Sequence, residues 1–136
     1  MGEFARDPSH WLRKLSPDEW IRAAMSEVKR AQAAYDQGNV RGGAAGAKRA
    51  AGMALNGVLL VVPNEAWGRT YVEHVEALGK DVDAPPAVRA ACGVVLDAGA
   101  PSHGVVVLRT PRSQAAVLEA AKDVIAHAWA VVKKHE

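Results

Sequence analysis

Apolar residues recur three and four positions apart along most of this chain of 136 residues, which is the periodicity of helices with one buried face. The clearest series follows the segment Ser16-Pro17-Asp18-Glu19. There, Ser, Pro and Glu occupy the N-cap, the first and the third helical positions, as in a capping box. The series ends at a turn at Gly38-Asn39 and consists of Trp20, Ala24, Val28, Ala31 and Tyr35. This pattern predicts a first amphipathic helix.

Small residues dominate the second predicted helix, which is expected from Val40, after the N-cap Asn39, to Val62, before Pro63. Its first half is amphipathic. In its last turns leucines also occupy the arc that is polar earlier, so we expect these turns to be buried on nearly all sides. The arc assigned as polar holds Arg41, Ala45, Lys48, Arg49, Gly52 and Asn56. The segment contains five glycines, and each costs a helix roughly 1 kcal/mol relative to Ala. We therefore expect a neighbouring helix to approach closely, within the domain or in a dimer.

The second half of the chain continues the helical pattern and shows no alternation typical of strands. Helices are expected at 70–78, ended by Gly79, from Pro85-Pro86 to about residue 98, and at 111–134, after Thr110. A loop is expected at 99–109. The sequence thus predicts one all-α domain over residues 16–136, an up-and-down bundle of four to five helices, after an N-terminal extension of residues 1–15.

Composition and charge narrow the classes of function only slightly. Lys and Arg exceed Asp and Glu by 17 to 15, which is too small an excess for a dedicated nucleic-acid binder. Cys92 is the single cysteine, and no spacing suits a metal or a cofactor, so we expect neither. The longest apolar run, 57–62, is far shorter than the roughly 20 residues that a membrane span needs. Without an N-terminal signal pattern, the expected location is the cytoplasm.

Arg69 and His74 form the sharpest candidate site. An Arg that binds phosphate and a His that moves a proton would suffice for RNA cleavage without a metal, because the 2′-hydroxyl supplies the nucleophile. On one helix, however, five positions place the two side chains about 140° apart. The pair can converge only if Arg69 lies in the preceding loop or a second subunit completes the site. The alternative is that Arg69 is a surface residue and His74 packs or hydrogen-bonds on its helix.

Other polar residues have weaker signals. The basic arc of Arg41, Lys48 and Arg49 predicts contact with phosphate or an acidic partner, or simply a solvated helix face. Cys92 lies among small apolar residues and is expected to be a buried, inert thiol. His103 has no carboxylate or cysteine at a catalytic spacing and is expected to be an exposed loop residue.

The order of these features resembles the HEPN family of small helical domains. The resemblance covers roughly residues 20–132. It rests on the helix that ends in Tyr35-Asp36-Gln37-Gly38-Asn39, the Ala-rich helix 44–60, the segment 71–78 (YVEHVEAL), and the long last helix. It implies a bundle of four or five helices that commonly dimerises and works around nucleic acids or nucleotides.

The resemblance also implies specific activities. Some HEPN members are metal-independent ribonucleases of toxin or defence systems, and others accompany a nucleotidyltransferase. The ribonuclease signature is an Arg, four to six residues, and a His, which Arg69 and His74 match, with Thr70 as the polar neighbour. In active members the signature lies late in the fold, usually on the last long helix, whereas here it precedes two further predicted helices. We therefore expect a noncatalytic binding or assembly module. It is expected to form a homodimer through the glycine-rich face of the second helix or through the last helix, with RNA or a nucleotidyltransferase as possible partners. A ribonuclease and a nucleotidyltransferase subunit are the alternatives.

Overall fold

The computed structural model describes residues 11–98 and 111–136. These residues form five α-helices and two short 3-10 helices, joined by short connections. The predicted all-α class is confirmed over these residues, which contain no strand. The α-helices are α1 (Pro17–Asp36), α2 (Val40–Val61), α3 (Tyr71–Lys80), α4 (Pro86–Asp97) and α5 (Pro111–Lys134), and the 3-10 helices are η2 (Trp11–Lys14) and η3 (Glu65–Trp67).

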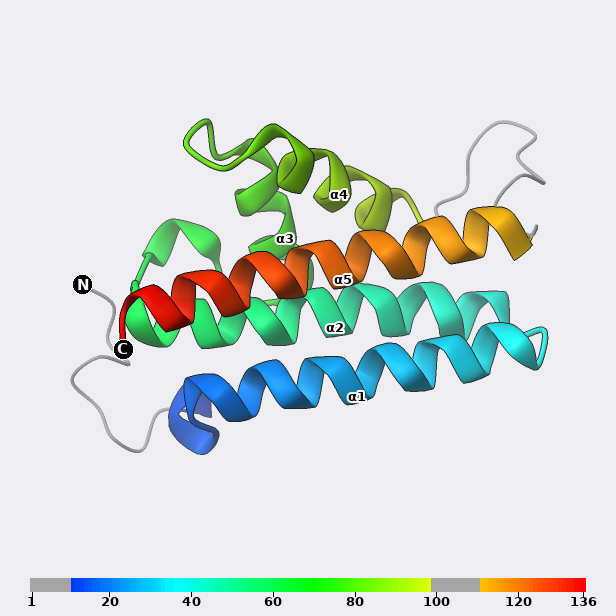
Figure 1. Ribbon diagram of the computed structural model, residues 1–136, viewed down its shortest axis with the longest axis horizontal. Coiled ribbons are helices and arrows are strands. Elements are labelled where there is room, and N and C mark those ends of the chain that lie inside the picture. Colours follow the sequence, from blue (N-terminus) through cyan, green and yellow to red (C-terminus); the bar gives the residue numbers. More distant parts are fainter. Residues whose placement is uncertain (1–10, 99–110) are drawn as a thin grey trace.

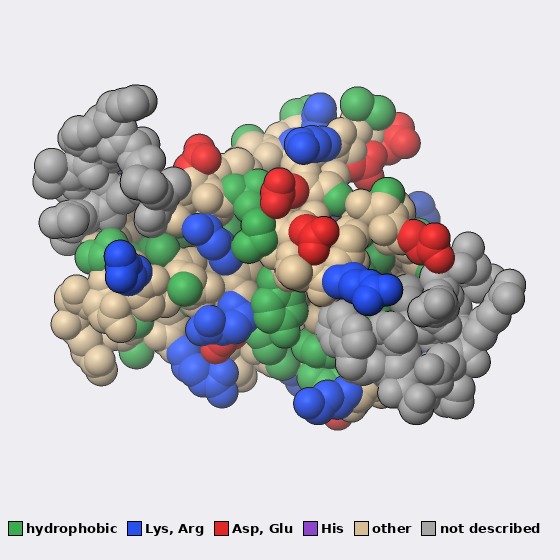
Figure 2. Space-filling model, turned by 180° about the vertical axis from the view of Figure 1, so that it is seen from behind, with side chains coloured by type: hydrophobic (Ala, Val, Ile, Leu, Met, Phe, Trp, Pro, Cys, Tyr) green, Lys and Arg blue, Asp and Glu red, His purple; other side chains and the backbone are tan. Residues whose placement is uncertain are grey.

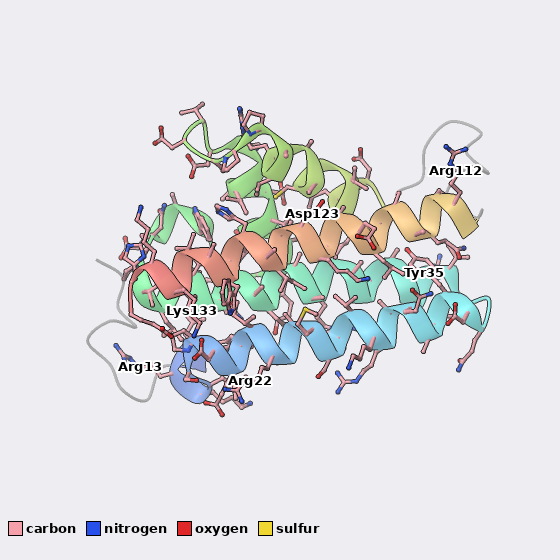
Figure 3. All side chains as sticks on the ribbon, viewed as in Figure 1. Arg13, Arg22, Tyr35, Arg112, Asp123 and Lys133 are labelled. Carbon is pink, nitrogen blue, oxygen red and sulfur yellow. The ribbon has the colours of Figure 1, made fainter. Side chains whose placement is uncertain are left out.

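The three long helices lie side by side, with α1 antiparallel to both α2 and α5 (Figure 1). The shorter α3 and α4 pack against each other and over α2 and α5. At one end of the bundle, Lys133 of α5 (labelled in Figure 3) lies 3.4 Å from a carboxylate oxygen of Asp18 in α1. This order differs from a simple up-and-down bundle because α3 runs across the long helices.

The predicted starts of α1, α2 and α3 are confirmed by their caps. Ser16 and Glu19 form the capping box of α1, and the Asn39 side chain accepts a hydrogen bond from the Gly42 amide at the start of α2. A second capping box, made by Thr70 and Glu73, begins α3. The predicted end of α3 is wrong, because the helix continues through Gly79 to Lys80.

The glycine-rich face of α2 is used inside the chain. A Cβ atom added to Gly46 would lie 2.9 Å from the Cβ of Ala31, and one added to Gly43 would lie 2.5 Å from the Tyr35 ring. The close helix contact predicted from these glycines therefore occurs between α1 and α2. Within the described residues, α2 leaves no exposed glycine face for a second subunit, because Gly43, Gly46, Gly52 and Gly57 are all buried.

The last turns of α2 are enclosed, as the leucine pattern predicts, but the enclosure extends further than expected. Gly52 and Asn56 were assigned to the polar arc, and both are buried. Tyr71 at the start of α3 covers Gly52, so the helix that crosses α2 removes this part of the arc from solvent. The Asn56 amide finds no hydrogen-bond partner among the described residues.

Part of the predicted N-terminal extension packs against the bundle. Leu12 in η2 is buried, and its carbonyl accepts a hydrogen bond of 2.9 Å from the indole Nε1 of Trp20. This contact anchors η2 at the start of α1. Over the described residues, none of the helices combines the length and the apolar character that crossing a membrane requires.

Candidate functional site

Arg69 lies in the short connection between η3 and α3, outside the helix that carries His74. Its backbone amide donates a hydrogen bond of 3.4 Å to Oε1 of Glu73, as part of the helix cap. The Arg69 side chain is exposed, and its guanidinium makes no ion pair within the described residues. The loop position thus meets one condition for convergence with His74, but the two side chains do not hydrogen-bond to each other.

His74 is a buried residue with 1% of its surface exposed. Its Nδ1 lies 2.8 Å from the carbonyl oxygen of Trp67, and the two rings are 6.5 Å apart between centroids. A carbonyl only accepts hydrogen bonds, so Nδ1 carries the proton and Nε2 does not. Nε2 is also buried and has no partner in the part of the chain described.

This environment keeps the His74 imidazole neutral. Burial lowers its pKa below the ordinary value, against smaller opposing effects of the Trp67 carbonyl and the Glu73 carboxylate. A general acid or base must come within hydrogen-bond distance of the proton that it transfers. In this conformation His74 cannot do so, because protein atoms cover the ring. Its geometry is that of a packing residue, which ties η3 to α3.

The predicted basic arc is divided by the fold. Arg41 is exposed near the start of α2, and Lys48 is half-exposed one residue before Arg49. One nitrogen of the Arg49 guanidinium already has a partner, since Nε donates a hydrogen bond of 2.8 Å to Oε2 of Glu27 in α1. Figure 2 shows several Lys and Arg side chains, with Asp and Glu side chains among them, on the face opposite to that of Figure 1.

Glu27 forms the centre of a charged cluster that the sequence pattern did not reveal. It is 5% exposed, and its second oxygen, Oε1, accepts a hydrogen bond of 2.9 Å from Nη1 of Arg30. Burial acts to raise the pKa of Glu27, but the hydrogen bonds from Arg49 and Arg30 outweigh it and leave the pKa below its ordinary value. Glu27 is therefore an ionised carboxylate held between two guanidinium groups. We call these three residues the Glu27 cluster.

One signal of the Glu27 cluster was present in the sequence. Glu27 follows Ala24 by three positions and precedes Ala31 by four, so it lies on the apolar face of α1. A charged residue on a buried face needs a partner of opposite charge. Arg30 is within reach on the same helix, whereas the contact with Arg49, 22 residues away, depends on the register between α1 and α2.

The remaining candidates among the described residues lack the arrangement of a catalytic or metal site. Cys92 is fully buried, as predicted, and burial raises its pKa to about 11. Burial also lowers the pKa of the half-buried His127. Across the ranges 11–98 and 111–136, no group of His, Cys, Asp and Glu side chains is placed to hold a metal ion. His103 lies outside the described residues.

Comparison with known proteins adds no further constraint, since neither a family model, nor a curated protein, nor a solved structure matches this chain.

Proposed function

We propose that this chain is a noncatalytic binding and assembly module, HEPN-like in type, that works in a nucleic-acid or nucleotide system such as a toxin-antitoxin or defence system. The burial of His74 carries the noncatalytic part of this proposal, because in the signature pair of Arg69 and His74 the imidazole is the group that would transfer a proton. Nδ1 of His74 is hydrogen-bonded to the Trp67 carbonyl and Nε2 is buried. We therefore assign His74 a structural role at the start of α3 and no role in catalysis.

Self-association is the second part of the proposal, and we assign it to α5. Trp129 is the bulkiest exposed apolar side chain among the described residues, with 51% of its surface accessible. It belongs to a line of accessible positions along α5 with spacings of three and four: Glu119, Lys122, Ala126, Trp129 and Lys133. This spacing is typical of a seam between two packed helices. We call this line the α5 seam.

The charges of the α5 seam favour a second copy of the chain as the occupant. In an antiparallel pair of α5 helices centred on Ala126, Glu119 of one copy faces Lys133 of the other, so opposite charges meet at both ends. The Lys133 ammonium lies 5.9 Å from the centroid of the Trp129 ring, which keeps the indole beside the positive end of the seam.

Light scattering at micromolar concentration tests the assembly. We expect a dimer for the wild type and a monomer for Trp129→Ala. Val82→Ala provides the control, since it removes an even more exposed apolar side chain, 80% accessible, away from the seam. A monomeric wild type would refute self-association.

A ribonuclease assay in EDTA tests the noncatalytic assignment. We expect no RNA cleavage by the wild type. Cleavage that is lost in both Arg69→Ala and His74→Ala would instead establish the metal-independent endoribonuclease. Copurification of a nucleotidyltransferase from the native cell would identify the chain as its accessory subunit, which is compatible with a binding module.

A further inference from the structure

The Glu27 cluster carries more positive charge than its buried carboxylate requires. Two guanidinium groups contact one carboxylate, so the cluster has a net charge of +1. A buried carboxylate is compensated by a single well-placed cation. Here the second cation is surplus, and it lies at the surface, because the side chains of Arg30 and Arg49 are 71% and 48% exposed.

The geometry of Arg49 leaves its best binding edge free. Arg49 contacts Glu27 through Nε, so its two Nη atoms and their four N–H groups have no partner within the described residues. Those two nitrogens form the fork that binds two oxygens of one phosphate. The ion pair with Glu27 also fixes the direction of the guanidinium in advance, which reduces the entropy lost when a ligand binds.

Tyr71 borders the cluster from a third helix. Its pKa responds to the charges of both Arg49 and Glu27, which places the phenol near them. Burial is the largest effect and raises the pKa of Tyr71, so the phenol stays protonated at neutral pH and keeps an O–H donor. Gly52 permits this position, since a Cβ atom there would lie 2.5 Å from the Tyr71 Cα.

We propose that Arg30 and Arg49, oriented by Glu27 and bordered by Tyr71, form a binding site for a phosphate group of a nucleotide or nucleic-acid strand. Arg30 on α1 and Arg49 on α2 direct guanidinium donors to this position from two helices, and a phosphate offers several oxygens to accept from them. The net charge of +1 matches the single negative charge of a phosphodiester.

This inference rests on the proposed function, because it supplies the nucleic-acid contact of the binding module. Its test is independent of the two earlier ones. Dimer formation depends on the α5 seam and cleavage on Arg69 and His74, and none of these residues belongs to the Glu27 cluster.

Fluorescence anisotropy with a labelled single-stranded RNA at low salt measures binding to the site. We expect Arg30→Ala and Arg49→Lys each to weaken binding about tenfold, as expected when one charge-assisted hydrogen-bond pair is lost. Arg49→Lys is informative because it keeps the positive charge while it removes the guanidinium fork, together with the Nε–H that holds Glu27. Arg22→Ala is the matched control. It removes an exposed Arg near the start of α1 (Figure 3), the helix that also carries Arg30. Because only a nonspecific charge effect is lost, we expect the dissociation constant to change less than about twofold.

Competition then defines the ligand. Displacement of the RNA by inorganic phosphate or by a nucleoside monophosphate indicates an isolated phosphate. Resistance to both, with the same loss in Arg30→Ala, indicates a phosphate within a strand. Either result supports the site.

Three outcomes would overturn the proposal. The first is equal binding by Arg22→Ala, Arg30→Ala and Arg49→Lys, which would indicate only a diffuse positive field. The second is an absence of binding by the wild type to RNA, phosphate and monophosphate. The third is tighter binding of an acidic peptide that the same variants abolish. If Arg49→Lys fails to fold, as judged by circular dichroism, Arg30→Ala decides, because its side chain is largely exposed and leaves Glu27 paired with Arg49.

Discussion

Gly52→Ala should destabilise the protein although alanine is the better helix former. Gly52 lies within α2 at the place where α3 begins. An added Cβ atom would meet the backbone of Tyr71, whose Cα would lie 2.5 Å away, as well as its side chain. Backbone atoms cannot turn aside as a flexible side chain can, so α3 must shift as a unit.

The magnitude follows from two opposing effects. Replacing Gly by Ala within a helix contributes roughly 1 kcal/mol of stability. Forcing an extra methyl group into a packed contact costs about 1–3 kcal/mol, and a backbone contact belongs at the upper end. We therefore expect the free energy of unfolding of Gly52→Ala to fall by about 1–2 kcal/mol.

Gly93→Ala provides the matched control for this experiment. Gly93 lies within α4, and a Cβ atom there would meet nothing within 4 Å. Only the helix-forming gain remains, so we expect this variant to be more stable by up to about 1 kcal/mol. Urea unfolding followed by circular dichroism measures both changes. If Gly52→Ala were stabilised as much as Gly93→Ala, the close contact between α2 and Tyr71 would be refuted.

Three further predictions concern ionisable and capping residues. The free energy of unfolding should fall as the pH is lowered from about 7 to 5.5, because burial lowers the folded-state pKa values of His74 and His127 while the unfolded chain takes up protons near pH 6.5. This stabilisation is complete above the unfolded-state pKa, and urea titrations giving a pH-independent free energy would contradict it. Cys92, buried and with its pKa raised to about 11, should react with a thiol reagent only as fast as the protein opens, so rapid modification of the folded protein would exclude the burial. Ser16→Ala and Thr70→Ala should each lower the unfolding free energy by about 1 kcal/mol, measured in urea, and unchanged midpoints would argue against the capping boxes.

Local signals in the sequence were sufficient to locate most of the helices. The capping box at Ser16 and the N-cap Asn39 depend on side chains that bond to backbone amides within three residues, so their geometry is independent of the rest of the fold. Gly79 was misjudged as a helix end because glycine permits a left-handed residue without requiring one. Among the described residues, only Gly38 and Gly68 take a positive φ, of 81° and 73°.

The candidate site was much less predictable. The spacing between Arg69 and His74 suggested chemistry, but a spacing does not specify exposure. Whether His74 meets solvent depends on η3, whose Trp67 carbonyl holds the imidazole. Likewise, Arg49 and Glu27 looked like unrelated charges on two helices until the register of α1 against α2 brought them to 2.8 Å.

By itself, therefore, the sequence determined the helical class, the starts of the helices and the need for a close helix contact at the glycines of α2. Each of these depends on interactions between residues near in sequence or on the size of a side chain. Only the tertiary structure decided that the contact lies within the chain, that His74 is enclosed, and that Glu27 gathers Arg30 and Arg49 beside Tyr71. These outcomes depend on the relative position of α1, α2 and α3, which no local pattern encodes, because burial and ion pairing arise where separate helices meet.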